Sequence, residues 1–376
     1  MKRILFALFL LIPGLLNAAE VAVPPPPALK ARSYILVDYD SGRALVEHNA
    51  DERLDPASIT KLMTAYVVFH ALKDGKLTLK ESATISEHAW KAEGSRTFLQ
   101  VGTQAPVEVL IQGMIVQSGN DATIALAERI GGTEETFAAL MNNYAKALGM
   151  KDSHFMNSSG LPAPEHYMTA RDMATLGAAI IREFPDYYKW YSQREFTWNK
   201  IRQENRNGLL GRDPSVDGIK TGHTESAGYC LVTSAKRNNM RLISVVLGTS
   251  SMKVREDASQ ALLNYGYTFY ETRKIHSAGE SLQDARVWKA AFTPAQIGLR
   301  RDLYLTAPRG QFNSLKSTIE VQPQLIAPLS VQKAVGTLTI SLGDKVLDKR
   351  YLYPLRDVAQ GGWWRRMVDS VLLWLE

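Results

Sequence analysis

Residues 56–72 read PASITKLMTAYVVFHAL, a stretch that predicts one long helix in the core of the protein. Asp55 is a favourable N-cap, and Pro56 suits the first helical position. After Lys61, no Asp, Glu, Lys or Arg follows up to Leu72. Because so apolar a helix belongs in a protein core, Lys61 is a single charge beside a buried segment.

Ser58 and Lys61 are three positions apart, which places them on one face of the helix about one turn from each other. Burial favours the neutral amine, and a neutral lysine is a suitable general base for a serine nucleophile. The alternative is a surface lysine whose stem lies along the protein near a helix start. Ser-x-x-Lys also occurs at residues 250–253 and 330–333, so the spacing alone is weak evidence.

A second motif, Ser-Gly-Asn, lies at a break in the mainly helical pattern of residues 107–180, which a loop at 157–164 interrupts again. The Ser118 hydroxyl can pass on a proton, and the Asn120 side-chain amide can donate to a substrate carbonyl. The alternative is an ordinary turn between two helices, for which Ser-Gly-Asn is well suited.

A third motif, Lys-Thr-Gly-His at residues 220–223, follows a short predicted strand at 217–219. A strand edge that leads into Gly222 lets a peptide approach the backbone and pair with it as an added strand. Lys220 and Thr221 offer a cation and a hydroxyl to a carboxylate. The backbone N–H groups of Ser58 and His223 are candidate oxyanion donors.

The residues exclude several other chemistries. The seven histidines are scattered outside any nucleophile elbow, and no His-Glu-x-x-His motif is present. Cys230 is the only cysteine, which excludes a disulfide framework and a cysteine-built metal site. It fits a buried strand position. The chemistry of the three motifs requires no metal or organic cofactor.

The three motifs together are far more specific than any one of them. Ser118 follows Ser58 by 60 positions, and Lys220 follows Ser118 by 102. This signature is that of penicillin-binding proteins and class A β-lactamases. The chain resembles the low-molecular-mass penicillin-binding proteins of the D-alanyl-D-alanine carboxypeptidase family, such as numbers five and six of Gram-negative bacteria. The stretches that carry the likeness are 33–36, 55–58, 117–121 and 216–223.

The resemblance implies a role for each motif residue in peptidoglycan maturation. Ser58 is acylated by the penultimate D-alanine carbonyl of a peptidoglycan pentapeptide, and water then hydrolyses the acyl-enzyme. Lys61 is the base and Ser118 the proton shuttle. The residues implied in substrate binding are Asn120, which also contacts the lysine, and Lys220, Thr221, Gly222 and His223. β-Lactam antibiotics are the implied covalent inhibitors.

Two arginines and one loop match the family less specifically. Arg206 and Arg255 correspond to arginines near the active site, where they help to hold the terminal carboxylate. The alternative is that both are ordinary surface or packing residues. Residues 87–99 match the flexible loop beside the nucleophile.

Two related activities and one non-enzymatic function remain as alternatives. A β-lactamase adds a glutamate in a Glu-x-x-Leu-Asn setting after the middle motif, whereas Glu165 here has no Leu-Asn after it. A DD-endopeptidase would cut the same kind of bond in cross-linked peptidoglycan. A penicillin sensor would be acylated without turnover, although three intact motifs argue against an abandoned site.

The pattern of elements predicts an α+β fold in two parts. The order of the elements predicts an antiparallel sheet covered by helices. The resemblance implies that residues 28–278 are a β-lactamase/transpeptidase-like domain, which adds a helical subdomain to this sheet. Residues 280–357 alternate as half-buried strands and predict a small all-β domain with a spacer or docking role. The elements expected in the first domain are a hairpin at 33–48, strands at 229–233 and 242–246, and a helix at 257–272.

Both ends of the chain carry patterns that predict where the protein is located in the cell. Residues 1–19 combine two basic residues, an apolar run and small residues, which is typical of an export signal peptide; the alternative is a membrane anchor. Residues 361–376 predict an amphipathic helix with three tryptophans, suited to lying in a membrane surface. Its alternative is a helix docked on the protein. The two ends predict an exported protein that lies on a membrane surface, and the resemblance to proteins of Gram-negative bacteria implies the periplasm and the outer face of the inner membrane.

The composition limits the classes of protein to which the chain can belong. The chain has 376 residues, 45% hydrophobic and 22% charged, with a net charge of +6. These values exclude a disordered chain and a polytopic membrane protein. The basic residues are scattered, so nucleic acid is not an expected partner. The sequence leaves the oligomeric state open.

Overall fold

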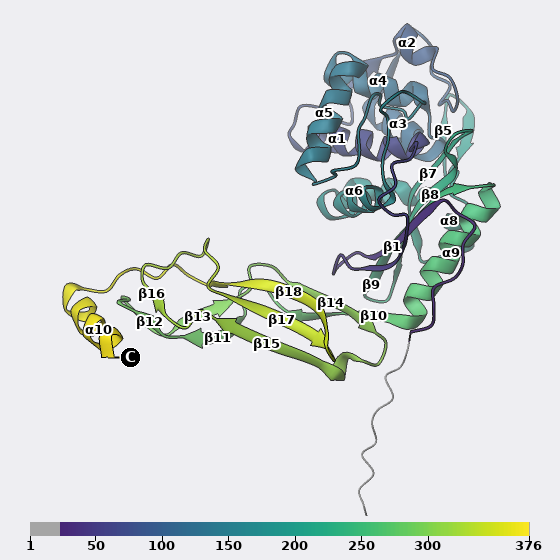
Figure 1. Cartoon of the computed structure of the whole chain (residues 1–376). Coiled ribbons are helices and arrows are strands. Elements are labelled where there is room, and N and C mark those ends of the chain that lie inside the picture. Colours follow the sequence, from purple (N-terminus) through teal and green to yellow (C-terminus); the bar gives the residue numbers. More distant parts are fainter. Residues whose placement is uncertain (1–22, 376) are drawn as a thin grey trace, which may run out of the picture.

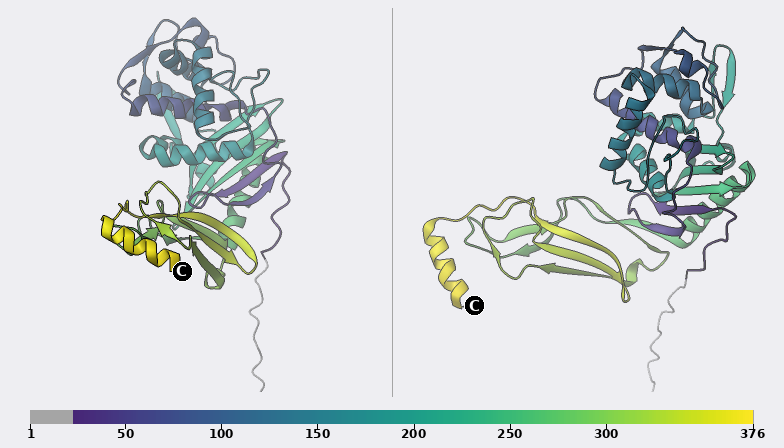
Figure 2. Two further views of the ribbon diagram at one scale, coloured as in Figure 1. Left: turned by 60° about the vertical axis from the view of Figure 1, so that its left-hand side comes forward. Right: turned by 45° about the horizontal axis from the view of Figure 1, so that its top comes forward.

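The computed structural model describes residues 23–375 of the chain. They form a helix-rich first unit built on a sheet, an elongated β unit and a C-terminal helix, α10 (Figure 1). In Figure 1 and in the right view of Figure 2, α10 lies at the end of the β unit remote from the first unit. The leader predicted for residues 1–19 lies outside the described residues.

A five-stranded antiparallel sheet with the order β2-β1-β9-β8-β7 organises the first unit. Its strands are β1 (Ser33–Asp38), β2 (Ala44–His48), β7 (Val216–Thr224), β8 (Gly228–Arg237) and β9 (Met240–Thr249). The predicted hairpin and central strands are therefore confirmed. Because β1 pairs with β9, the strands from the two ends of this unit form one sheet, and the helices inserted between β2 and β7 connect its two edge strands. Within the described chain, β7 has a neighbouring strand on only one side.

Helices cover both faces of this sheet. On β9, Ile243 and Val245 face a core shared with helices α1 (Lys61–Lys73) and α6 (Ala170–Glu183). On the same strand, Leu242 and Val246 face a second core with helix α9 (Met252–Phe269). Successive residues of a strand point to opposite faces of its sheet, so β9 serves both cores. The predicted α+β architecture is confirmed.

Two predicted helices differ from the structure at their ends. The helix expected at 257–272 begins at Met252, because the Ser251 side chain accepts the Val254 N–H at 3.2 Å and acts as N-cap. It ends at Phe269, where the chain becomes extended. The helix expected at 56–72 begins with a 3₁₀ turn, η1 (Ala57–Thr60), before α1 continues it.

The insertion between β2 and β7 is mainly helical, as predicted. Its helices are α1, α2 (Glu87–Trp90), α3 (Val107–Gln112), the π-helical turn η2 (Gly113–Gln117), α4 (Asn120–Gly131), α5 (Glu134–Ala147), α6, α7 (Pro185–Tyr188), η3 (Lys189–Ser192) and α8 (Leu209–Arg212). Two small strand pairs accompany them, β3 (Ser82–Thr84) with β4 (Gln104–Pro106) and β5 (Glu195–Trp198) with β6 (Ile201–Glu204).

The β unit consists of strands and one short 3₁₀ turn, η4 (Phe312–Ser314). Its strands are β10 (Tyr270–His276), β11 (Ser281–Ala285), β12 (Val287–Trp288), β13 (Ala295–Gly298), β14 (Leu303–Pro308), β15 (Leu315–Val321), β16 (Leu325–Ile326), β17 (Gly336–Leu342) and β18 (Lys345–Pro354). It has its own apolar core. Because β10 pairs with β14, strand pairing in this unit begins at Tyr270, before the predicted start at residue 280.

Helix α10 (Trp363–Leu375) meets the β unit with its polar side. Asp369 is only 8% exposed and accepts the backbone N–H of Lys289. A rotation of about 100° per residue places Leu373 on the same side, and it is half-buried. The predicted apolar stripe is exposed, with Trp364 61% and Trp374 85% accessible. Among the described helices, none is long and apolar enough to cross a membrane.

Candidate active site

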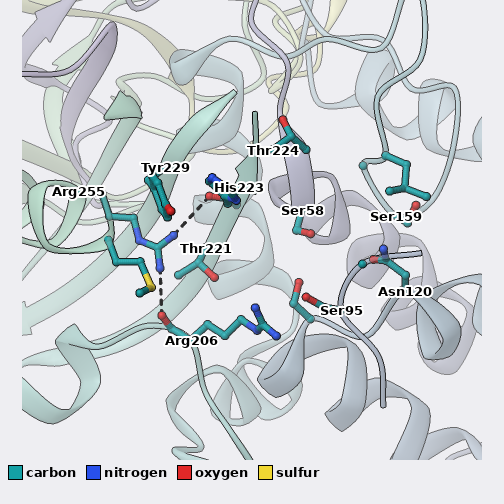
Figure 3. Close-up of a pocket in the computed structure, with 16 residues that line it drawn as sticks. Ser58, Ser95, Asn120, Ser159, Arg206, Thr221, His223, Thr224, Tyr229 and Arg255 are labelled. Atoms are coloured by element: carbon teal, nitrogen blue, oxygen red, sulfur yellow. Dashed lines mark hydrogen bonds between the residues drawn. The ribbon is translucent and has the colours of Figure 1, made fainter. Parts of the chain in front are cut away.

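A pocket of about 620 Å³ lies between the helical insertion and strand β7 (Figure 3). Eight predicted site residues line it, namely Ser58, Ser118, Asn120, Arg206, Thr221, Gly222, His223 and Arg255. The other two, Lys61 and Lys220, are buried, 1% and 3% exposed. The structure thus brings the three motifs together at one site.

Ser58 lies in the turn η1, directly before α1. The Lys61 Nζ is 3.0 Å from the Ser58 Oγ, as the three-residue spacing predicts. Asp55 holds the start of this turn, since its Oδ1 accepts the Ala57 N–H at 2.9 Å. Gly160 packs against the turn so closely that a Cβ there would overlap the Ala57 carbonyl oxygen. The position of Ser58 is therefore fixed from two sides.

Lys61 has three polar neighbours, which suit a neutral amine. Its Nζ donates to the Asn120 Oδ1 and to the Ser159 carbonyl oxygen, each at 2.6 Å. Both of these oxygens are acceptors only. A neutral amine has two N–H groups for them and one lone pair, which can accept the Ser58 hydroxyl proton. Burial lowers the pKa of Lys61 from 10.5 to about 7, so the neutral form is available near neutral pH.

Ser118 follows the π-helical turn η2 in the left-handed region, with φ of 64°. Its Oγ is buried and has no hydrogen-bond partner among the described residues. Gly119 comes next because a Cβ at this position would overlap the Thr97 side chain. A buried hydroxyl without a partner, at the wall of the pocket, is free to bond a substrate atom.

Asn120 has a fixed orientation. Its Nδ2 donates to the Glu93 carbonyl at 2.5 Å, which leaves its Oδ1 facing Lys61. Its backbone N–H donates to the Ser95 carbonyl at 2.7 Å. These bonds place the loop predicted at residues 87–99 beside the nucleophile, with Ser95 in the pocket wall. One Asn120 side-chain N–H is therefore already used, which leaves one for a substrate carbonyl.

The second half of β7 forms the opposite wall. A Cβ on Gly222 would lie 3.1 Å from the Pro56 carbonyl oxygen and 3.1 Å from the Ile59 Cγ1. Glycine therefore lets the strand pack against the nucleophile turn, a reason that differs from the predicted approach of a substrate. The Lys220 Nζ donates to the Thr221 carbonyl at 3.1 Å, and burial holds the pKa of Lys220 well below its usual value.

The two arginines differ in position. Arg206 extends into the pocket toward Ser95 (Figure 3), while its Nε donates to the Gln117 carbonyl at 3.2 Å. Arg255 is 3% exposed and donates to the carbonyls of Gly222 at 3.4 Å and Arg206 at 3.2 Å. Arg255 thus supports the backbone of the pocket wall, whereas Arg206 presents its charge to the pocket.

The site is electropositive. Among the described residues, neither the two lysines nor the two arginines of the site form an ion pair with a carboxylate. In the same part of the chain, no aspartate or glutamate lines the pocket. Glu165 in particular is exposed on a loop, where its carbonyl is 2.7 Å from the His154 Nδ1. An anionic ligand is therefore favoured.

Two contributors to the site carry no recognisable motif. Ser159 acts through its main-chain carbonyl, which no side-chain pattern can signal. The sequence predicts residues 157–164 as a loop and gives no sign of this contact. Tyr229 lies against His223 with ring centroids 4.0 Å apart, and the pairing of β7 with β8 places it there.

A sheet with this helical insertion and a buried lysine on a serine hydroxyl define a serine acyl-transfer enzyme. Comparison with known proteins gives the family. A model described as D-alanyl-D-alanine carboxypeptidase matches residues 19–251, and one described as penicillin-binding protein 5, C-terminal domain, matches residues 270–360. D-alanyl-D-alanine carboxypeptidase DacA of Escherichia coli is 44% identical over 94% of this chain and 90% of its own length.

Comparison with solved structures gives the same family. Penicillin-binding protein 5 from Haemophilus influenzae superposes with a TM-score of 0.87 at 43% identity, covering 90% of this chain and 100% of that one. Penicillin-binding protein D2 from Listeria monocytogenes, in an ampicillin-bound form, superposes at 0.60 with 31% identity, covering 65% of this chain and 100% of that one. The chain therefore belongs to the D-alanyl-D-alanine carboxypeptidase family of serine peptidases and is an enzyme of that class.

Proposed function

We propose that this enzyme removes the terminal D-alanine from peptidoglycan pentapeptides through an acyl-enzyme on Ser58. The observation that carries the proposal is the environment of Lys61, whose Nζ lies 3.0 Å from the Ser58 Oγ and whose pKa is lowered by burial to about 7. The Ser58 Oγ attacks the penultimate D-alanine carbonyl carbon while its proton passes to the Lys61 Nζ. The C–N bond then breaks, and the leaving D-alanine amine takes a proton by way of Ser118.

Water completes the reaction. It attacks the ester carbonyl carbon, Lys61 takes its proton, and the Ser58 oxygen leaves as the hydroxyl. The backbone N–H groups of Ser58 and His223 would stabilise the oxyanion in both halves of the reaction. Both residues line the pocket, which supports their assignment.

Substrate binding is assigned to the strand β7 and the positive charges. An extended peptide can add to the free edge of β7 alongside Thr221 and His223. Its terminal carboxylate would be bound by Arg206 and Lys220, with the hydroxyl of Thr221. Arg255 would act indirectly, because its hydrogen bonds go to the backbone of the pocket wall.

β-Lactams would acylate Ser58 and leave slowly. A class A β-lactamase uses a glutamate to activate the deacylating water. The described residues that line the pocket include no such carboxylate. We therefore expect penicillin to be an inhibitor and not a substrate with rapid turnover.

The proposal is tested by measuring D-alanine release from an N-acylated Lys-D-Ala-D-Ala peptide with and without penicillin. We expect release at about 1 per second or faster at saturation, and its loss after penicillin labelling. Labelling without release would favour a sensor or an endopeptidase that needs cross-linked substrate. Rapid penicillin hydrolysis would favour a β-lactamase.

The pH dependence of D-alanine release follows from Lys61. The base is active when neutral, and burial lowers the pKa of Lys61 to about 7. The logarithm of kcat/KM should therefore rise with a slope near one below that pH and level off above it. Rates measured across this range check the expectation, and a profile that keeps rising through neutral pH and levels off only above about pH 10, where an ordinary lysine titrates, would contradict a depressed pKa.

We further propose that the protein is exported to the periplasm by residues 1–19 and attached to the outer face of the inner membrane by α10. The exposed apolar stripe with Trp364 and Trp374 supports this attachment, since tryptophans favour the headgroup boundary. At 13 residues, α10 is suited to lying in the interface and not to crossing the bilayer.

Deletion of residues 361–376 is expected to move the protein from the membrane fraction to the soluble fraction. The deletion removes the exposed stripe but leaves the buried core of the β unit, which lies in residues 285–358. D-Alanine release by the truncated protein should stay within about twofold of the full chain, because distant sites act independently. Unchanged fractionation after deletion would contradict the attachment.

A further inference from the structure

A hydrogen-bond network lies behind the carbonyl that receives Lys61. The Ser159 carbonyl oxygen is 2.6 Å from the Lys61 Nζ. The preceding residue, Ser158, donates its backbone N–H and its Oγ to the Glu134 Oε1, at 2.8 and 2.5 Å. Its carbonyl accepts from the Thr64 Oγ1 of helix α1 at 2.6 Å. Both peptide groups that flank Ser158 are thus bonded, one to Glu134 and the other to α1.

We propose that Glu134 is a positioning residue for the reaction, which holds Ser158 so that the next carbonyl receives the Lys61 amine and which places a negative charge behind that amine. The inference rests on the role proposed for Lys61 as the base. Glu134 is not among the described residues that line the substrate pocket, so it acts through the loop and through its charge.

The charges around Lys61 favour an electrostatic effect of Glu134. Burial is the main influence on the pKa of Lys61 and lowers it, and Glu134 is the leading charge that opposes this shift. Asp121 acts in the same direction, while Arg206 acts against both. Lys220 is a further buried amine near Lys61, and its pKa is lowered by burial and by the charge of Lys61. The Glu134 side chain is only 12% exposed, so solvent screens its charge incompletely.

His88 of helix α2 is the titratable neighbour of Glu134 on its other side. Its Nε2 lies 3.6 Å from the Glu134 Oε2, and its Nδ1 lies 3.1 Å from the Glu128 Oε1. Glu128 therefore shares the contact with His88, but among the described residues it makes no hydrogen bond to Ser158. Glu128→Gln is accordingly a matched control for removing one acid near the imidazole.

Two substitutions separate charge from position. Glu134→Gln keeps an oxygen that can accept from Ser158 and removes only the charge. Without that charge the Lys61 ammonium is less favoured, so the pKa of Lys61 should fall. The acidic limb of the profile, which is the rise of kcat/KM below this pKa, should therefore move to lower pH by about 0.5 to 1 unit. Glu134→Ala leaves the Ser158 N–H and hydroxyl without a buried acceptor, so the loop should loosen and kcat at the plateau should fall about tenfold or more.

The experiment measures kcat and KM for D-alanine release from about pH 5 to 9, with the full chain and with Glu134→Gln, Glu134→Ala and Glu128→Gln. The profiles are repeated in a His88→Gln background, so that titration of the imidazole is removed as a source of the shift. Thermal unfolding of each variant identifies any general loss of fold. Glu134→Gln should keep the plateau kcat of the wild-type protein, and Glu128→Gln should leave the limb unmoved.

If the acidic limb of the kcat/KM profile lies at the same pH in Glu134→Gln as in the wild-type protein, the electrostatic part of the inference is overturned. A plateau kcat unchanged in Glu134→Ala, or lost equally in Glu134→Gln, overturns the positioning part. A wild-type profile without an acidic limb would instead contradict the proposed role of Lys61. The failure of the inference is thereby distinguished from the failure of the proposed function.

Discussion

Ser58→Ala is expected to lower D-alanine release by about 10⁴-fold or more and to abolish covalent labelling by penicillin. The substitution removes the atom that forms the acyl bond, while the η1 turn keeps its other contacts. The Asp55 carboxylate still accepts the Ala57 N–H, and Gly160 still packs against the turn. Non-covalent binding of the peptide should change little, since the strand β7 and the arginines are intact.

A matched serine makes this test specific. Ser95 also lines the pocket but lies on the loop that Asn120 holds, so Ser95→Ala should retain labelling and most of the activity. Mass spectrometry of the penicillin adduct locates the modified peptide directly. Release that survives in Ser58→Ala, or an adduct on another residue, would show that the nucleophile is wrongly assigned.

Lys61→Met is expected to lower kcat by about 10²- to 10⁴-fold, the usual contribution of a general base. Methionine is a similar, unbranched side chain that cannot take the Ser58 proton. The oxygens of Asn120 and Ser159 would also lose their donor, which adds a cost in stability of about 1–3 kcal/mol for each buried acceptor left unpaired. Kinetics and thermal unfolding should therefore be measured together.

Lys61→Arg is the companion variant, because it keeps a donor for the two oxygens but cannot act as a base. A guanidinium stays protonated throughout the range in which the enzyme works. We expect this variant to be as inactive as Lys61→Met at every pH, and to lack the acidic limb of the wild-type profile. Substantial activity of the arginine variant would argue against a base at this position.

Local patterns predict much of the fold. The hairpin of β1 and β2 and the pair of β8 and β9 show the composition and length that strands favour. The residues at which helices and strands begin and end are harder to predict from the sequence, because capping depends on single side chains. Ser251 starts α9 earlier than the sequence pattern indicates. Tyr270 belongs to a strand because it pairs with Pro308, a contact that no local pattern contains.

The motifs predict which side chains meet, but not how they are held. Side-chain chemistry and spacing point to Ser58, Lys61 and Asn120, whose contacts the structure describes. The contributions of Ser159 and Gly160 depend on a carbonyl oxygen and on the absence of a Cβ, and neither feature has a side-chain signature. Such backbone features become visible only when the loop is placed against the helix.

The free edge of β7 also affects the tendency of the protein to aggregate. Open sheet edges tend to recruit strands from other copies. Here the first half of β7 is occupied, since the Asn207 Nδ2 donates to the Gly218 carbonyl at 3.1 Å and η3 packs nearby. The remaining edge is short, lies in the pocket wall and is flanked by the cation of Arg206. A second copy would bring the same positive charge, which disfavours pairing between two copies at this edge. A single extended peptide with a negative charge can still bind there.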